Sequence, residues 1–163
     1  MRSALALVFV LLLPISFVSA EPEISKEVLT AGQSATDALA RLEPAATEPR
    51  AFYEPRKLEA EKALDSLRHK VKTPRDKDAT QVLRNWYSDI TAARTQYESG
   101  NLKLEMAARY AAAACHLEAS VIFDPQAEMT AYGRAEAAKK SCTPKTKAVW
   151  DAMEANLKQP PTK

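Results

Sequence analysis

Residues 78–123 read DATQVLRNWYSDITAARTQYESGNLKLEMAARYAAAACHLEASVIF, and this stretch determines the predicted fold. Apolar residues in its first half recur at alternating spacings of four and three, the period of one face of an α-helix. They are Ala79, Leu83, Trp86, Ile90, Ala93 and Tyr97. Gly100 follows at a position where a left-handed residue ends a helix, and Asn101 can cap the next helix. Residues 78–99 and 101–123 are therefore predicted to form two antiparallel helices joined by a short turn.

The helix predicted over residues 101–123 carries two apolar stripes. The first consists of Ala107, Tyr110, Ala114, Leu117 and Val121, and the second of Leu104, Ala108, Ala111, Cys115 and Ile122. A helix that is apolar on most of its surface is usually enclosed by other helices, so we expect it to be central in the fold. Four aromatic residues on apolar stripes are expected in the core, namely Trp86, Tyr97, Tyr110 and Trp150. Tyr53 and Tyr87 lie off these stripes and are expected to be partly exposed.

Prolines and polar residues divide the rest of the chain into further helices. We expect helices over residues 21–44, 55–71 and 125–140, separated in one place by the linker EPAATEPR at residues 43–50. A sixth helix is expected to begin at Thr143-Pro144 and to contain Val149, Trp150, Met153 and Leu157. Residues 21–158 should thus form a single domain, a compact antiparallel bundle of five to six helices, and residues 159–163 a disordered tail.

The composition supports an all-α domain. The whole chain holds three glycines, fewer than the turns of a β-rich domain of this size would need. Good helix formers such as Ala, Leu, Glu, Lys and Arg are abundant instead. A hydrophobic content of 46% excludes a wholly disordered chain, and the length is sufficient to bury a core.

Residues 1–20, MRSALALVFVLLLPISFVSA, have the pattern of a cleaved signal peptide. Arg2 precedes an apolar run, and Val18-Ser19-Ala20 supplies the small residues that a signal peptidase requires. The run is shorter than a membrane-spanning helix and contains Pro14, so we expect no stable membrane insertion. The mature protein is therefore expected to be periplasmic or secreted. The Ala-rich composition and the absence of an N-x-S/T sequon favour a bacterial origin.

The charge pattern contains one unusual segment. Lys and Arg number 23 against 21 Asp and Glu, and this near balance gives no long-range attraction to nucleic acid, which we exclude as a partner. Residues 68–77, RHKVKTPRDK, are the exception, because they carry the cations Arg68, Lys70, Lys72, Arg75 and Lys77. They are a candidate contact for an anionic partner, such as lipid headgroups, acidic glycans or an acidic protein. The alternative is a solvated loop whose cations are favoured by the end of the preceding helix.

Cys115 and Cys142 are the two cysteines of the chain, and an even pair in an exported protein predicts a disulfide. The predicted helices pose a difficulty. If residues 125–140 ran antiparallel to the preceding helix, Arg134 would lie level with Cys115, and Cys142 would be about 12 Å farther along the axis. A disulfide requires Cα atoms within about 7 Å. The bond therefore requires the fifth helix to end early, or residues 139–141 to turn back over the fourth.

Motifs for metal, haem or catalysis are absent from the sequence. It contains no Glu-x-x-His pair, HExxH, CxxC or CxxCH. Asp65, Ser66 and His69 share one helix surface, but no glycine-rich or strained turn accompanies them to form an oxyanion hole. Cys115 and His116 are adjacent in a helix and point about 100° apart, so they cannot act as a nucleophile and its base. We assign no catalytic, metal-binding or cofactor-binding residue.

These observations favour an exported, non-enzymatic helical protein. We expect a binding, scaffold or chaperone-like accessory protein of the bacterial envelope, whose partner is another protein or envelope component. The alternative is a carrier of a small ligand, haem included, with a pocket between helices. Haem could be held non-covalently by a Met and a His, drawn from Met106, Met129, Met153, His69 and His116, although Met at helical spacing normally fills the core.

Overall fold

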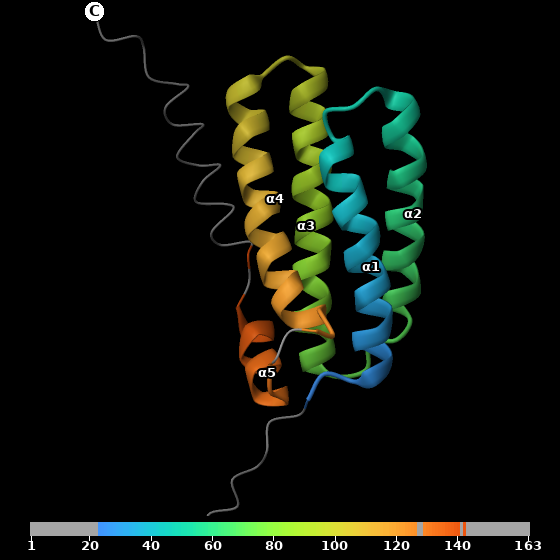
Figure 1. Ribbon diagram of the computed structural model, residues 1–163, viewed down its shortest axis with the longest axis vertical. Helices are drawn as coiled ribbons and strands as arrows, with labels where there is room; N and C mark the ends of the chain where they lie inside the picture. The colour runs from blue at the N-terminus through green and yellow to red at the C-terminus, as the bar shows by residue number, and fades with distance from the viewer. Residues whose placement is uncertain (1–22, 127–128, 141, 143–163) are drawn as a thin grey trace, which may run out of the picture.

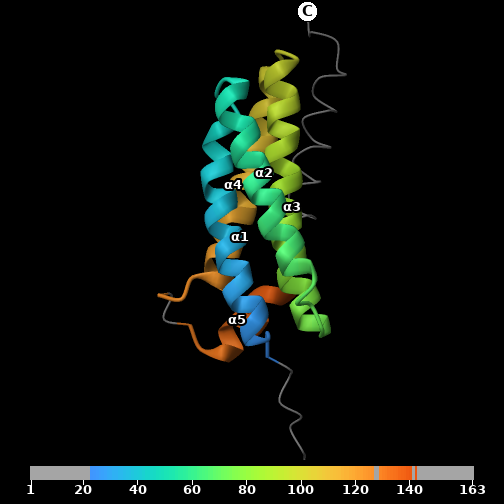
Figure 2. The same cartoon turned by 90° about the vertical axis from the view of Figure 1, so that its right-hand side faces the viewer.

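The computed structural model of the protein describes residues 23–126, 129–140 and 142. These residues form five helices and no strand: α1 (Lys26–Ala45), α2 (Arg50–Arg68), α3 (Pro74–Glu98), α4 (Leu102–Phe123) and α5 (Ala131–Lys139). Figures 1 and 2 show the four long helices side by side, each antiparallel to the next along the chain. The prediction of an all-α helical bundle is confirmed. The predicted signal peptide, sixth helix and C-terminal tail lie outside the described residues.

The α3–α4 hairpin forms where the sequence predicts it. Gly100 has φ 71°, the left-handed conformation that ends α3, and the side chain of Asn101 accepts a hydrogen bond from the Leu104 amide. This pair of helices makes the most extensive contact in the bundle. The hairpin therefore follows from local signals in the sequence, and the other helices pack around it.

The core lies between the four long helices, and α5 adds Ala137 and Ala138 to it. Large side chains from α1 and α3 fill it, and α4 contributes mainly small ones. The fully buried side chains include Val28, Leu39, Leu42, Leu83, Trp86, Ile90, Ala108 and Cys115. α1 approaches the end of α4 closely at Gly32, where an added Cβ would lie 2.2 Å from Cε1 of Phe123. The alanines of α4 and this glycine allow the helix backbones to come close together.

The first helix begins at Lys26 instead of residue 21, and the next two helices begin earlier than predicted. The second helix begins at Arg50 instead of residue 55, so the connection from α1 is shorter than the predicted linker and Pro55 lies inside α2. Pro55 leaves the carbonyl of Ala51 without its helical donor, and Ala51 is exposed, so water can satisfy it. The third helix begins at Pro74 instead of residue 78. Thr73 and Asp76 form a capping box there, with Pro74 at the first helical position.

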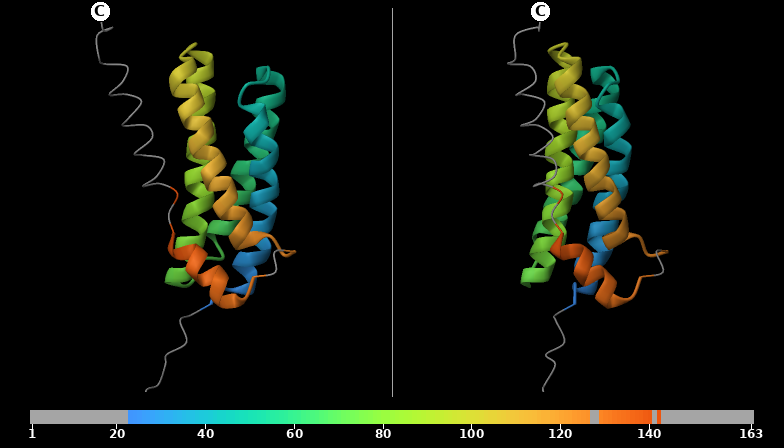
Figure 3. Two further views of the ribbon diagram at one scale, coloured as in Figure 1. Left: turned by 60° about the vertical axis from the view of Figure 1, so that its left-hand side comes forward. Right: turned by 90° about the vertical axis from the view of Figure 1, so that its left-hand side faces the viewer.

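The fifth helix is shorter than predicted and runs in another direction. It begins at Ala131 instead of residue 125, because Asp124 accepts a hydrogen bond from the Gln126 amide in a turn and Thr130 caps the helix. Figure 3 shows α5 lying across the lower ends of the long helices. Arg134 donates to the carbonyl of Ile122 at 3.1 Å, so it lies far from the level of Cys115. The assumption of an antiparallel fifth helix was the error in the disulfide geometry.

The prediction that the fourth helix is enclosed on most sides is also wrong. Its second stripe is buried except for the partly exposed Leu104, but Tyr110 and Leu117 of the first are 69% and 72% exposed. Tyr97 is half exposed as well, with the Arg94 guanidinium 5.6 Å from its ring centre. Tyr53, expected near the surface, is buried with Arg94 on its ring. Although α4 is apolar, no described helix has the combination of length and apolarity needed to cross a membrane.

Candidate functional site

The predicted basic segment lies at the lower end of the bundle, in and around the turn between α2 and α3 (Figure 1). Arg68 is the last residue of α2, and Lys70 and Lys72 lie in the turn. These three residues and Lys77 are exposed, whereas Arg75 is buried. Lys72 approaches Glu27 of α1 to within 3.9 Å. The structure therefore gathers four of the five cations on one exposed end and removes Arg75 from that set.

Asp76 holds this basic turn in place. Its carboxylate accepts hydrogen bonds from the backbone amides of Ser25, Lys72 and Thr73 at 2.8, 3.1 and 3.1 Å. Burial alone would raise the pKa of the Asp76 carboxyl, but these hydrogen bonds lower it more, and the net pKa lies below its usual value. The carboxylate thus fixes the start of α1 against the turn that carries the cations.

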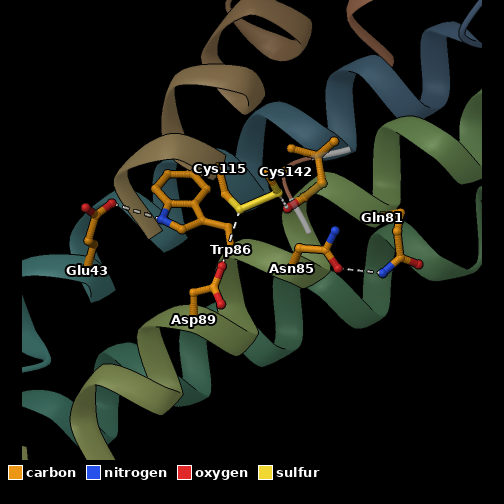
Figure 4. The surroundings of a disulfide bond; sticks show 8 residues. Glu43, Gln81, Asn85, Trp86, Asp89, Cys115 and Cys142 are labelled. Carbon is orange, nitrogen blue, oxygen red and sulfur yellow. Dashed lines mark hydrogen bonds between the residues drawn. A yellow bond between two sulfur atoms is a disulfide. The ribbon is translucent and has the colours of Figure 1, made fainter. Parts of the chain in front are cut away.

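The predicted disulfide between Cys115 and Cys142 is present, with a Cα–Cα distance of 5.2 Å. Both cysteines are buried, and Figure 4 shows their disulfide beside Trp86 and Asp89 of α3. Cys115 Sγ lies 3.5 Å from Asp89 Oδ2. α5 ends at Lys139, within one residue of its predicted end, and the chain reaches Cys115 because α5 does not run antiparallel to α4 as assumed. A buried disulfide is typical of proteins outside the reducing cytoplasm, and it is structural here.

A polar cluster that the sequence reasoning missed joins α1, α3 and α4. Glu43 Oε2 accepts a hydrogen bond from Trp86 Nε1 at 2.9 Å and lies 3.0 Å from His116 Nδ1. The His116 ring stacks on the indole of Trp86, with centres 4.3 Å apart. Glu43 was predicted to begin a linker, and it lies 73 residues from His116. No local sequence signal marks such a contact, because it depends on how three helices pack.

Glu43 and His116 of this cluster line a groove between α1 and α4. The groove has a volume of about 610 Å³ and is open to solvent; its lining comprises Ala40, Glu43, Pro44, Met106, Arg109, Tyr110, Ala113 and His116. Met106 and His116, two of the residues considered for haem, both lie in it. They are ten residues apart on one helix, about 15 Å along its axis, which is too far for opposite ligands of one iron. Nowhere in the described chain do three or more His, Cys, Asp or Glu gather for a metal ion.

The outer face of α4 beside this groove is apolar and exposed. Its large side chains are 38% to 72% exposed and recur at helical spacing: Leu102, Met106, Tyr110, Leu117 and Val121. We call this set the outer row of α4. Lys103 and Arg109 are the exposed charged residues of the helix, and both are cationic. The outer row and the groove together form the candidate functional surface, which has the character of a contact surface and not of a reaction centre.

Comparison with known proteins adds no assignment to this surface. The chain matches no protein-family model, no curated protein and no solved structure.

Proposed function

We propose that the mature protein is an exported, non-enzymatic binding or scaffold protein, a chaperone-like accessory of the bacterial envelope, located in the periplasm or secreted. The outer row of α4 is the observation that carries this proposal. Exposed apolar residues scattered singly need no explanation, but a continuous row on one helix face marks an interaction site. The signal-like sequence of residues 1–20 and the buried disulfide support a location outside the cytoplasm.

The chemistry of the row indicates the kind of partner. Apolar side chains at spacings of four and seven residues are the anchors by which one helix packs along another. The exposed charges on α4 are cationic: Arg109 is paired with the buried Glu105 at 3.6 Å, and Lys103 can complement a carboxylate on the partner. We therefore propose a partner protein that contributes an apolar helix face edged by acidic residues. The four exposed cations around the α2–α3 turn would form a second, anionic-partner contact at the end of the bundle.

Site-specific photo-crosslinking in intact cells tests the proposal. A photoreactive residue at Leu117, in the outer row, should produce crosslinks to a discrete partner protein. The matched control is the same residue at Leu58, which is 52% exposed on α2, outside the row. Equal crosslinking from both positions, or none from Met106, Tyr110 and Leu117, would refute the assignment. Crosslinks from Lys70, Lys72 or Lys77 to anionic molecules would test the second contact separately.

The alternative, a small-ligand carrier, rests on the groove between α1 and α4. Its lining combines apolar side chains with the polar residues Glu43, Arg109 and His116, as is typical of a ligand site. The absorbance spectrum of the purified mature protein distinguishes the two proposals for haem, because a Soret band would favour the carrier. For colourless ligands, native mass spectrometry of the same protein would show a mass above that of the oxidised chain.

A further inference from the structure

A second groove lies between the first half of α1 and the end of α2. The two helices run antiparallel and side by side, so the start of α1 is level with the end of α2 (Figure 1). The groove has a volume of about 720 Å³ and is open to solvent. None of its lining residues belongs to α4, so it is separate from the outer row and from the groove that contains His116.

Each side of this groove presents three polar side chains at a spacing of four residues. They are Lys26, Thr30 and Ser34 from α1, and Lys62, Ser66 and Lys70 from α2 and the turn directly after it. Residues four positions apart lie on one face of a helix. The groove is therefore edged by two rows of hydrogen-bond donors, each about 12 Å long. We call these six residues the donor rows.

The three lysines of the donor rows are available to a ligand. They are exposed, and in the described part of the chain none of their ammonium groups forms an ion pair. Glu27 is the one carboxylate in the lining, and it lies 3.9 Å from Lys72. Glu59, three residues before Lys62, is 2.6 Å from Arg41. The groove thus carries positive charge that its own acidic neighbours do not neutralise, which favours an anionic ligand.

The hydroxyl groups between the lysines indicate what kind of anion fits. Among the described residues, the side-chain hydroxyls of Thr30 and Ser66 have no hydrogen-bond partner, so both can bond to a ligand. A single phosphate would occupy only one end of the donor rows, whereas an elongated ligand can use their whole length. The small residues Ala31 and Ala63 complete the lining, and none of the exposed large apolar side chains of the described surface belongs to it. The acyl chains of a lipid would therefore find no apolar contact in this groove.

We propose that this groove binds an acidic oligosaccharide. Its carboxylates would lie on the lysines of the donor rows, and its sugar hydroxyls would bond to Thr30 and Ser66. The proposal rests on the anionic contact proposed above for the end of the bundle, with which it shares Lys70, and it gives that contact a groove and a ligand class. It does not depend on the outer row of α4.

Isothermal titration calorimetry of the purified, oxidised mature protein tests the ligand class. The probes are tetrasaccharides of galacturonic, glucuronic or mannuronic acid, and the matched control is the methyl ester of each, which keeps the sugar and removes the charge. At least one acid should bind, its affinity should fall several-fold between about 50 and 300 mM NaCl, and the esters should not bind. Failure of all three acids, equal binding of an ester, tighter binding of tripolyphosphate, or binding only to vesicles of anionic phospholipid would overturn the proposal.

Variants of the same protein test the position of the site. Lys62→Gln/Lys70→Gln should weaken the binding of the acid by about fivefold or more. The control Lys57→Gln/Arg84→Gln removes the same charge from positions outside the groove and should change the affinity less than about twofold. Ser66→Ala should weaken binding with its salt dependence unchanged, because it removes a hydrogen bond and no charge. Far-ultraviolet circular dichroism checks that each variant is folded.

Two outcomes separate this proposal from the proposed function. Equal weakening by the two double variants would overturn the groove, because it would show attraction to net charge alone. A greater loss from Lys77→Gln, outside the groove, than from Lys62→Gln would also overturn the groove but would leave the anionic contact at the α2–α3 turn in place. Partner crosslinks from Leu117 should persist in all of these variants.

Discussion

Helices α3 and α4 are antiparallel neighbours of similar length that use their apolar residues in opposite ways. α3 is the more polar of the two, yet its stripe from Ala79 to Ala93 is buried. α4 is the more apolar, yet Leu117 is 72% exposed. The number of neighbours explains the difference, because α3 contacts α1, α2, α4 and α5, whereas α4 contacts only α1, α3 and α5 among the described elements. Apolar content alone does not decide how much of a helix is buried.

The largest expected effect comes from the centre of the α3 stripe. Trp86→Ala would remove a fully buried indole and its hydrogen bond to Glu43, so it should lower the free energy of unfolding by about 3–5 kcal/mol. Urea unfolding followed by circular dichroism measures this loss. Tyr110→Ala on the outer row of α4 is the matched control, and it should change the same free energy by less than about 0.5 kcal/mol. Equal losses in the two variants would contradict the comparison.

Reduction of the disulfide tests how much the covalent link to α4 contributes to the stability of the protein. Cys115 and Cys142 are 27 residues apart, and closing a loop of that length contributes about 3.5 kcal/mol to stability. We expect the urea midpoint of the mature protein to fall on addition of reductant. The Cys115→Ala/Cys142→Ala variant should show the lower midpoint with and without reductant. An unchanged midpoint in the reduced wild-type protein would show that packing alone holds Cys142 on α4.

Gly32→Ala tests the close contact between α1 and the end of α4. The added Cβ would lie 2.2 Å from a ring carbon of Phe123, which is 2% exposed and cannot move aside freely. We expect a loss of about 1–3 kcal/mol in unfolding free energy, although alanine is intrinsically the better helix former. Gly133→Ala in α5 is the control, because its Cβ would meet the flexible end of Met129. Thermal melts should therefore show a lower midpoint for Gly32→Ala only.

The Asp76 carboxyl at the start of α3 should make the free energy of unfolding depend on pH. The Asp76 carboxyl has a lowered pKa, because the amide hydrogen bonds that it accepts outweigh the effect of burial. Its contribution is fully present above the unfolded-state pKa near 3.8 and is lost as the pH falls through the lower folded-state pKa. Asp76→Asn should cost about 1 kcal/mol at neutral pH and flatten this acid dependence. Unfolding free energies measured between pH 2 and about pH 7 in both proteins would show whether the slopes differ.

The smallest effect is expected on the outer row of α4. Leu117→Ser should change the free energy of unfolding by less than about 0.5 kcal/mol, because the side chain is already largely in water. The same substitution should weaken the partner crosslinks proposed for this face. A loss of stability comparable to that of Gly32→Ala would show that Leu117 is buried in the folded protein, contrary to the comparison with α3.

Strong local signals in the sequence predicted the turn between α3 and α4 correctly. Asn101 caps α4 and Gly100 ends α3 as expected, because a capping side chain and a positive φ are properties of a few consecutive residues. The predictions failed where a distant contact decided the outcome. Tyr53 is buried because Arg94, 41 positions later, covers its ring. The number of cysteines predicted that Cys115 and Cys142 pair, but it did not predict the path of the chain between them.

The candidate site was harder to predict from the sequence than the fold. The basic segment was found from its composition, and the structure removed only Arg75 from its exposed set. The groove between α1 and α4 was missed, because Glu43, Trp86 and His116 come from three helices and no spacing in the sequence connects them. Tyr110, Leu117 and Val121 of the outer row were recognised as part of an apolar stripe on a helix expected to be enclosed, whereas Leu102 and Met106 were assigned to neither stripe.

The sequence by itself determined that the chain is helical, where the central hairpin turns and which cysteines pair, because these depend on short-range periodicity, capping and composition. Only the tertiary structure decided which apolar stripe of α4 faces solvent, where α5 crosses the bundle and how Glu43 meets His116. Periodicity identifies the apolar face of a helix but not what covers it, since burial depends on neighbours that are distant in the chain.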